Sequence, residues 1–505
     1  MNDSAASDAI RFILDGERIE VRDLSATTTV LEWLREHRGR CGTKEGCAEG
    51  DCGACTVVVG ELIDLGGSEG AASSDTSGGG ERMRYRAINS CIRFLPTLDG
   101  KELVTVESLA DGETLHPVQQ AMVDQHASQC GFCTPGFVMS LFALYQQGNK
   151  AMREDVVEAL AGNLCRCTGY RPIIDAGCAM DGYATPARWS RADAQARVHV
   201  DALRAIRRDR ALQLPGFTAP RNVDELAAAY ANTPDSLLLA GGTDVGLWVT
   251  KHLRELPPLI YLGEVAELQR IETHDGALRI GAAVSLTDGW NAIVAAQPAL
   301  AELAQRFASP PVRNSGTLVG NIANGSPIGD AMPALIVLGA TVELRKGDTT
   351  RVLPLEALYL DYMKKDLARG EFVVAVTIPA ARKSVKLASY KLSKRIDQDI
   401  SAVCAAFAIE LDGERVRDAS IAYGGMAAIP ARAQHAESAL RNQSWTAATV
   451  EQACAALVQD FTPLTDMRAS ADYRLAGAQN LLRRFFLEHG VAPQSLRTFA
   501  AEVST

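Results

Sequence analysis

Apolar and polar residues alternate at the start of the chain, on both sides of Asp15-Gly16 in the stretch IRFILDGERIEV. Asp-Gly between two such runs favours a tight turn, so we expect the fold to begin with a β-hairpin. The next stretch, TTVLEWLREHRG, has an amphipathic helical pattern, with threonine at its cap and Gly39 beyond its end, and predicts a short helix. The run TVVVGELI after Cys55 predicts a strand.

The period of the apolar residues changes to 3.6 from about residue 114. The stretches LHPVQQAMVDQH, FVMSLFALYQQ and REDVVEALAG are all helical in pattern. A small helical domain is therefore expected after a β-rich one. Within the β-rich part, the segment 61–83 contains the polar run GGSEGAASSDTSGGG, which we interpret as a mobile surface insertion without chemistry.

Residues 185–212 lose the apolar face and gain charge, which indicates a linker that is partly helical. From LPGFTAPRNVDELAAAY onward, strand and helix patterns alternate. The last region opens with LASYKLSKR and contains AAFAIEL and VRDASIAYGGM. The second half is thus expected to be α/β or α+β.

Composition changes this picture little but excludes some functions. With 505 residues, the chain is too long for one hydrophobic core, and about three or four domains are expected. The formal charge of -10 argues against nucleic-acid binding, which needs a basic face. The start MNDSAASDAIRF does not resemble a signal peptide, and no run of ~20 apolar residues follows. We therefore expect a cytoplasmic protein without membrane contact.

Cysteine is unevenly distributed along the chain. The twelve cysteines are at positions 41, 47, 52, 55, 91, 130, 133, 165, 167, 178, 404 and 454. Ten of them precede residue 180. In a reducing cytosol, such clustering argues for metal or redox chemistry rather than a disulfide framework.

The first cysteine set has the spacing of plant-type [2Fe–2S] ligands. It consists of Cys47, Cys52, Cys55 and Cys91. Gly46, Gly50 and Gly53 would let the backbone approach the inorganic sulfides and donate N–H groups to them. A four-cysteine zinc ribbon is the alternative, but such ribbons usually contain two C-x2-C pairs, so we favour the cluster. Cys41 is outside this spacing and is expected to be an unligated thiol.

The second set combines a C-x2-C pair with a C-x-C pair. It consists of Cys130, Cys133, Cys165 and Cys167, with both pairs near predicted helix ends. Zinc is not forbidden here, although C-x-C is awkward for tetrahedral coordination. A thioredoxin-like disulfide would need neither Cys165 nor Cys167. The nearby first set favours a second iron–sulfur cluster.

Together, GCAEGDCGACTV, QCGFCTPG and NLCRCTGYRPI resemble the iron–sulfur part of the xanthine dehydrogenase (molybdenum hydroxylase) family. The resemblance extends from residue 10 to about 180. It implies a β-grasp ferredoxin domain and a four-helix domain, each with one [2Fe–2S] cluster. It also implies that the cluster of the helical domain lies next to a molybdopterin in a separate catalytic domain, and that Gln129 faces the pterin.

Two glycine-rich stretches stand out in the second half, LLLAGGTDVGLWV and RNSGTLVGNIANGSPIGD, each with a strand pattern before it. Either one alone could be an ordinary turn. Two such loops favour backbone N–H groups that converge on a phosphate-bearing ligand. Neither is G-x-G-x-x-G, so a Rossmann site is not expected.

These loops resemble those around the FAD pyrophosphate in the same family. The implied contacts are Leu238, Leu239, Ala240, Gly241, Gly242, Thr243, Asp244 and Val245, followed by Thr317, Leu318, Val319, Gly320, Asn321 and Asp330. Val319 departs from the usual T-L-G-G-N pattern, in which it would be glycine. Phe307, Val373 and Lys391 fall on further flavin-contact positions, but the first two could equally be core residues.

The C-terminal stretches YKLSKRIDQDISAV and AYGGMAAIPARA resemble the flavoprotein tail of the family. A charged loop such as SKRIDQD is usually just solvated. In the family, the equivalent loop lies over the flavin and influences whether NAD or oxygen takes the electrons. Tyr362 falls near the nicotinamide side, and Asp399 is expected there as well.

The family's molybdenum-binding domains have no counterpart in this sequence, so we expect a large molybdopterin-binding partner subunit, in a dimer of heterodimers. The order cluster, cluster, flavin resembles the small subunit of the xanthine dehydrogenases. It implies that electrons from hypoxanthine or xanthine, oxidised to urate on the partner, pass through two clusters to FAD and NAD. The alternatives are an aldehyde or other N-heterocycle hydroxylase and, in a different class, a zinc scaffold or redox sensor.

The resemblance thus implies a multidomain α+β fold. The expected domains are a plant-type ferredoxin domain (8–98), a helical [2Fe–2S] domain (99–184), a linker (185–212), an α+β FAD-binding domain (213–385) and an α+β flavoprotein C-terminal domain (386–498).

Overall fold

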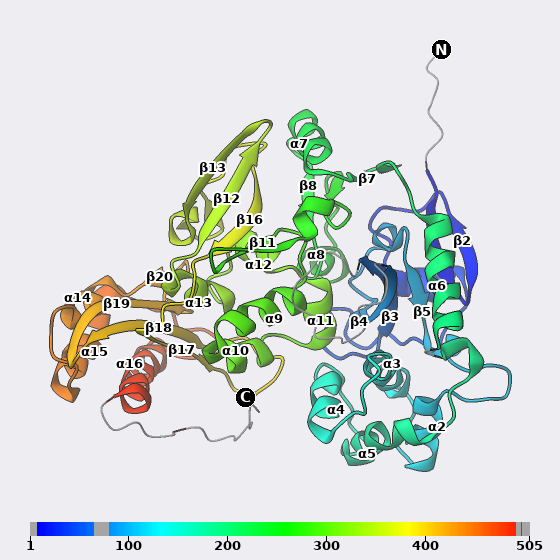
Figure 1. Ribbon diagram of the computed structural model, residues 1–505, viewed down its shortest axis with the longest axis horizontal. Coiled ribbons are helices and arrows are strands. Elements are labelled where there is room, and N and C mark those ends of the chain that lie inside the picture. Colours follow the sequence, from blue (N-terminus) through cyan, green and yellow to red (C-terminus); the bar gives the residue numbers. More distant parts are fainter. Residues whose placement is uncertain (1–7, 65–79, 191, 491–495, 497–505) are drawn as a thin grey trace. The chain divides into compact units, whose positions relative to one another are not determined.

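The computed structural model describes residues 8–64, 80–190, 192–490 and 496 (Figure 1). The chain folds as two compact units. The first extends to Arg270 and also contains segments 281–288 and 308–317, and the second contains 271–280, 289–307 and the chain from Leu318 onward. Most of the expected polar insertion, residues 65–79, lies outside the described residues.

A five-stranded sheet of order β2-β1-β5-β3-β4 opens the first unit. Its strands are β1 (Ile10–Leu14), β2 (Glu17–Val21), β3 (Thr56–Asp64), β4 (Glu81–Asn89) and β5 (Glu102–Val104). β1 pairs in parallel with β5, whereas β1–β2, β3–β4 and β3–β5 are antiparallel. Asp15 and Gly16 adopt φ values of 58° and 82°, as a two-residue hairpin turn requires, so the predicted hairpin is confirmed.

The predicted short helix begins as α1 (Val30–Glu32) and continues as a wider π-helical turn over Trp33–His37. Thr29 caps it, because its hydroxyl accepts from the Glu32 N–H and the Glu32 carboxylate accepts from the Thr29 N–H. Trp33 packs edge-on against Phe12, with ring centroids 5.1 Å apart. The helix thereby covers the sheet, which gives the β-grasp arrangement.

The predicted helical domain consists of four helices. They are α2 (Pro117–Asp124), α3 (Thr134–Tyr145), α4 (Arg153–Leu160) and α5 (Arg171–Ala179). Nine of the twelve residues of α3 are buried, so α3 is the central helix of this domain. The change of period seen in the sequence is therefore confirmed.

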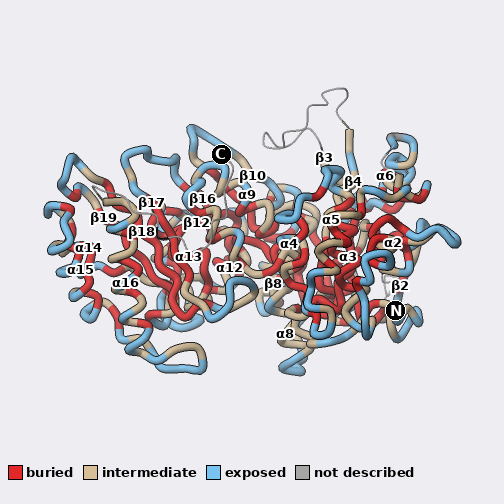
Figure 2. Tube along the Cα trace, turned by 90° about the horizontal axis from the view of Figure 1, so that it is seen from below, coloured by how far each residue is buried: buried red, intermediate tan, exposed pale blue. Residues whose placement is uncertain are grey.

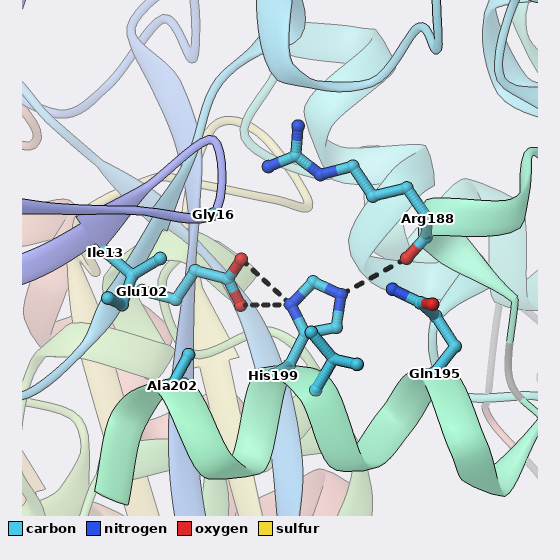
Figure 3. Close-up of a pocket in the computed structure, with 8 residues that line it drawn as sticks. Ile13, Gly16, Glu102, Arg188, Gln195, His199 and Ala202 are labelled. Atoms are coloured by element: carbon cyan, nitrogen blue, oxygen red, sulfur yellow. Dashed lines mark hydrogen bonds and ion pairs between the residues drawn. The ribbon is translucent and has the colours of Figure 1, made fainter. Parts of the chain in front are cut away.

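The segment expected to be a linker is more closely packed than its sequence suggested. It forms α6 (Asp193–Ile206), and the predicted loss of an apolar face is wrong, because Val200, Leu203 and Ile206 are buried. Leu203 and Ile206 pack on Ile13 of the β-grasp sheet. Figure 3 shows the pocket beside this contact, where His199 of α6 lies between the Glu102 carboxylate and the Arg188 carbonyl.

The remainder of the first unit carries a small sheet of order β6-β7-β9-β8. Its strands are β6 (Leu212–Leu214), β7 (Phe217–Ala219), β8 (Leu237–Leu239) and β9 (Leu259–Tyr261). The helices are α7 (Val223–Asn232), α8 (Val245–Thr250) and α11 (Pro310–Ser315), and α9 (Leu286–Ala296) begins in this unit and ends in the second. In β8, Leu239 is buried and pairs in parallel with Tyr261.

The described residues of the second unit form three sheets, of order β10-β11-β16-β12-β13, β14-β15 and β17-β18-β19-β20. The strands are β10 (Ile271–His274), β11 (Ala277–Gly281), β12 (Thr341–Lys346), β13 (Thr349–Pro354), β14 (Tyr359–Asp361), β15 (Lys364–Lys365), β16 (Phe372–Ile378), β17 (Val385–Leu392), β18 (Val403–Asp412), β19 (Arg415–Gly424) and β20 (Ala431–Arg432). The helices are α10 (Ala301–Gln305), α12 (Leu318–Asn324), α13 (Ala331–Val337), α14 (Gln434–Leu440), α15 (Ala447–Asp460) and α16 (Ala471–His489).

Buried residues concentrate along β18, β19 and α13 of this unit (Figure 2). Phe407 of β18 packs on Tyr423 of β19 and on Phe485 of α16. The fold is thus multidomain α+β, as predicted. Among the described residues, no helix is both long and apolar enough to cross a membrane.

Candidate cofactor sites

The first cysteine set lies on the loop before β3 and on the turn after β4. The thiols of Cys55 and Cys91 are 3.2 Å apart and buried. The Cys47 sulfur accepts backbone N–H groups of Asp51 and Cys52, each at 3.4 Å. The loop therefore presents its thiols in pairs and donates backbone hydrogen bonds to sulfur, as a [2Fe–2S] cluster requires.

The glycines of this loop lie close to protein atoms, and their predicted approach to inorganic sulfides stays a prediction. Gly50 and Gly53 have φ values of 76° and 70°. A β-carbon at Gly46 would lie 2.8 Å from the Cys52 sulfur, and one at Gly53 would lie 2.2 Å from the carbonyl oxygen of Gly162. Side chains at these positions would displace either a ligand or the neighbouring domain.

The thiols of the first set differ in acidity. The Cys52 thiol donates to Cys47 and, with the backbone N–H groups, lowers the Cys47 pKa to about 5. The same contact raises the Cys52 pKa. Cys91 likewise lowers the pKa of Cys55, while its own pKa is raised. In each pair one thiol is thus easier to ionise than the other, and bound iron would deprotonate both.

The second cysteine set lies in the helical domain, before α3 and before α5. Cys167 is 3.7 Å from Cys130 and 3.9 Å from Cys165, sulfur to sulfur. Burial opposes ionisation of Cys165, but its hydrogen bonds from Thr168 lower its pKa to about 7. Burial and the neighbouring thiols raise the Cys133 pKa to about 12. These four thiols also stand in pairs.

Across the described residues, no group of three or more His, Cys, Asp or Glu side chains is arranged to hold a single metal ion. A binuclear cluster needs two thiolates on each iron instead of one convergent set. The paired sulfurs of both sets fit a [2Fe–2S] cluster in that respect.

The two cysteine loops touch each other through the backbone. The Leu164 N–H donates to the carbonyl of Cys52 at 3.0 Å, and Leu164 directly precedes Cys165. Buried Asn163 donates to the Gly53 carbonyl at 3.1 Å and accepts from the Ser140 hydroxyl at 2.7 Å. Asn163 was missed from the sequence, although it adjoins the second cysteine pair.

The first glycine-rich loop connects β8 to α8. Gly242 has a φ of 73°, which favours glycine. A β-carbon at Gly241 would lie 2.1 Å from the Ser315 carbonyl oxygen, and one at Gly316 would lie 3.1 Å from the Thr243 hydroxyl. The structure thus brings the start of the second glycine-rich stretch against the first loop within one unit, as two converging loops predict.

The strand expected before the second stretch is wrong. Residues 310–315 form α11, and 318–324 form α12, so Val319 is a buried helical residue. Before α11, Ala308 has a φ of 50° and the buried Ser309 hydroxyl has no partner among the described residues. The buried Oδ1 of Asn321 has none there either. Within the first unit, the free Ser309 hydroxyl and the glycine cradle fit a bound dinucleotide.

The remaining FAD positions belong to the second unit. Asp330 and Lys391 form a buried ion pair of 2.7 Å, and Ser401 donates to the other oxygen of Asp330 at 2.5 Å. Arg306 donates to the Lys391 carbonyl at 3.0 Å. Lys391 therefore has a fixed position on β17.

Phe307 and Val373 are both buried. Phe307 packs on Trp290, with ring centroids 5.6 Å apart, and Val373 of β16 pairs with Leu344 of β12. Core packing alone accounts for these contacts, so their flavin roles stay predictions.

Three positions expected to face other molecules are at least partly accessible. Gln129 is exposed beside Cys130, and Tyr362 is 66% exposed between β14 and β15. Asp399 lies in the charged loop after β17, where its carboxylate accepts from the Arg395 N–H at 2.8 Å. Backbone hydrogen bonds there offset burial and lower the Asp399 pKa.

A contact missed from the sequence joins the first cysteine loop to α8. The Thr250 hydroxyl donates to the Ala48 carbonyl at 2.7 Å, and the Lys251 ammonium donates to the Cys47 carbonyl at 3.1 Å. Leu247 of α8 packs on the apolar cluster that contains Cys55 and Cys91. The helix that follows the first glycine-rich loop is therefore in direct contact with a cysteine set.

Four family descriptions match consecutive parts of the chain. They are the 2Fe-2S iron-sulfur cluster binding domain (12–92), the [2Fe-2S] binding domain (105–178), the FAD binding domain in molybdopterin dehydrogenase (210–381) and the CO dehydrogenase flavoprotein C-terminal domain (388–489). Their order is cluster, cluster, flavin, as predicted.

Nearly the whole of this chain is similar to parts of longer, well-characterised proteins. Xanthine dehydrogenase of Emericella nidulans is 32% identical over 96% of this chain and 39% of its own length. Aldehyde oxidase 2 of Cavia porcellus is 29% identical over 95% of this chain and 40% of its own. This chain thus spans about two fifths of the length of these relatives.

Among solved structures, carbon monoxide dehydrogenase from Hydrogenophaga pseudoflava, in a form that lacks the Mo-pyranopterin moiety, is 31% identical, with a TM-score of 0.50. That match covers 53% of this chain and 94% of the other. Nearly all of the other chain therefore has a counterpart here.

Proposed function

The chain belongs to the molybdenum hydroxylase family, and on this premise we propose that it is the electron-transfer subunit of a xanthine dehydrogenase. In this proposal, a large molybdopterin-binding partner oxidises hypoxanthine or xanthine to urate. Electrons then pass through two [2Fe–2S] clusters to FAD and NAD. The chain itself contributes no catalytic residue, and its task is to hold and couple the cofactors.

One observation carries the proposal: within one unit, the two cysteine loops contact each other, and the flavin segment contacts the first of them. The Leu164 N–H joins the second cysteine loop to the Cys52 carbonyl, and Lys251 joins the first loop to α8. When bound, the clusters supply one-electron transfer and the flavin supplies two-electron transfer. The residues of this chain fix the separations that such transfer needs.

We assign the cofactor ligands by residue. The eight cysteines of the two sets hold the clusters, and the two glycine-rich stretches, with Asp330 and Lys391, hold FAD. Tyr362 and Asp399 adjoin the nicotinamide, and Gln129 faces the partner's pterin. We also propose the domain boundaries given by the sequence, a cytoplasmic location and a dimer of heterodimers.

Purification of the native complex tests the proposal. The complex should contain about four irons and one flavin per copy of this chain, as two [2Fe–2S] clusters require. It should reduce NAD with xanthine, and mass spectrometry should identify the large partner. Zinc without flavin would contradict the proposal and favour a zinc scaffold.

A second candidate differs in substrate alone. Aldehyde oxidase 2 of Cavia porcellus and the xanthine dehydrogenase of Emericella nidulans have similar identity to this chain. An aldehyde or N-heterocycle hydroxylase would therefore use the same electron path. Assays of the complex with xanthine, benzaldehyde and quinoline, each with NAD or oxygen, separate these possibilities.

A further inference from the structure

We propose that Lys251 raises the reduction potential of the first cluster, and that Thr250 and Lys251 together fix the first cysteine loop on α8. This inference rests on the proposed function, since it requires a [2Fe–2S] cluster on Cys47, Cys52, Cys55 and Cys91. Both are positioning residues: Thr250 acts through the loop, and Lys251 acts through the loop and through its charge. Neither belongs to the cofactor contacts assigned above.

Two hydrogen bonds and one ion pair connect α8 and the residue after it to the first cysteine loop. The Lys251 ammonium lies 3.1 Å from the carbonyl oxygen of Cys47, a predicted iron ligand, and 3.2 Å from the Glu49 carboxylate. The Thr250 hydroxyl donates to the Ala48 carbonyl between them. Ala48 has a φ of 55°, so this stretch holds a conformation that few non-glycine residues adopt.

The apolar part of the contact explains why α8 sits so close. Gly246 leaves no room for a side chain, because a β-carbon there would lie 2.5 Å from the Ile92 carbonyl oxygen. Leu247 packs with Leu31, Ile92 and the two buried cysteines. The helix therefore approaches the ligand set both at Cys47 and at Cys55 and Cys91. The contact residues lie in and directly after α8, which begins at Val245, immediately after the first glycine-rich loop.

The charges give the effect its sign. A reduced cluster carries one more negative charge than an oxidised one, so a nearby ammonium stabilises the reduced form and raises the potential. Loss of the ammonium would also leave the Glu49 carboxylate unbalanced, which acts in the same direction. The Lys251 side chain is 40% exposed, so solvent and salt screen the effect.

The test is a redox titration of the full chain, with electron paramagnetic resonance to follow each reduced cluster. In Lys251→Met, the equilibrium constant for reduction of the first cluster should fall about threefold. This corresponds to a reduction potential lower by ~30 mV for a one-electron couple. The other cluster should not move. Lys251→Arg should restore the wild-type value, and Glu49→Gln should move the same cluster in the opposite direction. High salt should diminish both shifts.

Thr250→Val and Lys383→Met serve as matched controls. Thr250→Val removes the neighbouring hydrogen bond without a change in charge, and Lys383→Met removes an exposed lysine elsewhere. Neither control should lower the reduction potential of the first cluster as Lys251→Met does, or raise it as Glu49→Gln does.

Iron and flavin analysis of the wild-type chain comes first. Absence of iron would overturn the proposed function and this inference with it, whereas absence of flavin alone would overturn the proposed function and leave this inference to the titration. If both clusters and FAD are present but Lys251→Met and Glu49→Gln shift no potential, or shift it in the same direction, this inference alone fails. If Lys251→Met does not fold, the sign of the Glu49→Gln shift decides.

Discussion

Gly241 occupies a position where one additional carbon would separate two parts of the predicted flavin site. A β-carbon there would lie 2.1 Å from the Ser315 carbonyl oxygen and 2.5 Å from the Gly316 α-carbon. Both contacts are to backbone, which cannot swing aside as a side chain can. Gly242 differs, because its φ of 73° restricts it to glycine while the nearest atom to a β-carbon is 3.5 Å away.

We therefore expect Gly241→Val to weaken FAD binding at least ~10-fold, which corresponds to ~1.4 kcal/mol. Absorbance of the purified chain measures the flavin, and iron content should stay at the wild-type level. Gly182→Ala is the matched control, because nothing lies within 4 Å of a β-carbon there. Wild-type flavin content in Gly241→Val would contradict the assignment of this loop.

The cysteine ligands give a second prediction at this scale. Cys52→Ser and Cys165→Ser should each abolish one of two distinguishable reduced [2Fe–2S] signals in electron paramagnetic resonance, because each removes a thiolate ligand. Cys41→Ser should change neither, since Cys41 is exposed and outside the ligand spacing. Loss of a cluster with Cys41→Ser, together with its retention in Cys47→Ser, would show that the assigned spacing is wrong.

Residues were predictable from the sequence where spacing along the chain defines the site. The two cysteine sets and the glycine-rich loops satisfy this condition. Asn163 and Lys251 do not, because their contacts join segments far apart in the sequence, as in the hydrogen bond from Lys251 to the Cys47 carbonyl. A lone lysine or asparagine carries no local signal for such a contact.

At the scale of elements, α6 shows how an apolar face can be hidden in a charged segment. Its buried residues Val200, Leu203 and Ile206 have helical spacing, but arginines surround them in the sequence. The strand expected before the second glycine-rich stretch failed for another reason. Pro310 and Pro311 occupy the first turn of α11, a helix-start signal that was overlooked.

His199 fastens α6 to the ferredoxin domain and makes that contact sensitive to pH. Its Nδ1 is 3.1 Å from both Glu102 oxygens, and its Nε2 is 3.2 Å from the Arg188 carbonyl oxygen. Both nitrogens thus face acceptors, and the doubly protonated ring alone can donate to both. Burial opposes this charge, but Glu102 raises the pKa of His199 above its usual value.

Other groups also surround Glu102 and the His199 ring. The Tyr85 hydroxyl donates to Glu102 at 3.0 Å, and burial with that contact raises the pKa of Tyr85. Trp189 stacks on the His199 ring, with centroids 5.5 Å apart. The Arg188 guanidinium, which opposes the His199 charge, points away from the ring in Figure 3.

Because the folded pKa of His199 is raised, its contribution to stability is complete below the unfolded value of ~6.5 and is lost as pH rises through the folded value. His199→Gln should therefore destabilise the chain by about 2 kcal/mol at pH 6, and by less at higher pH. Thermal unfolding between pH 6 and pH 9 measures this. His274→Gln, at an exposed position in β10, should leave the profile unchanged, and an unaltered profile in His199→Gln would refute the role.

At the scale of the whole molecule, the order of domains matters more than any single motif. The two cysteine loops contact each other, and the flavin segment contacts the first of them. Together they form a connected series of cofactor sites, whereas one motif alone would not identify its cofactor. The sequence predicted this order because each domain carries its own local signature. It could not predict the contacts between domains, such as the Arg313 ion pair with Glu158 at 3.0 Å.

The acceptor half of the proposed reaction can be isolated from the molybdenum half. If electrons leave through FAD to NAD, the chain with its clusters and FAD, but without the molybdopterin partner, should pass electrons from NADH to an artificial dye. Xanthine should give no reduction. Tyr362→Ala or Asp399→Asn should slow NADH oxidation about tenfold or more while FAD stays bound, because both side chains are assigned beside the nicotinamide. Tyr473→Ala, at another exposed tyrosine, serves as the control. A chain with full cofactors that fails to oxidise NADH, in a complex that reduces oxygen readily, would be an oxidase subunit instead.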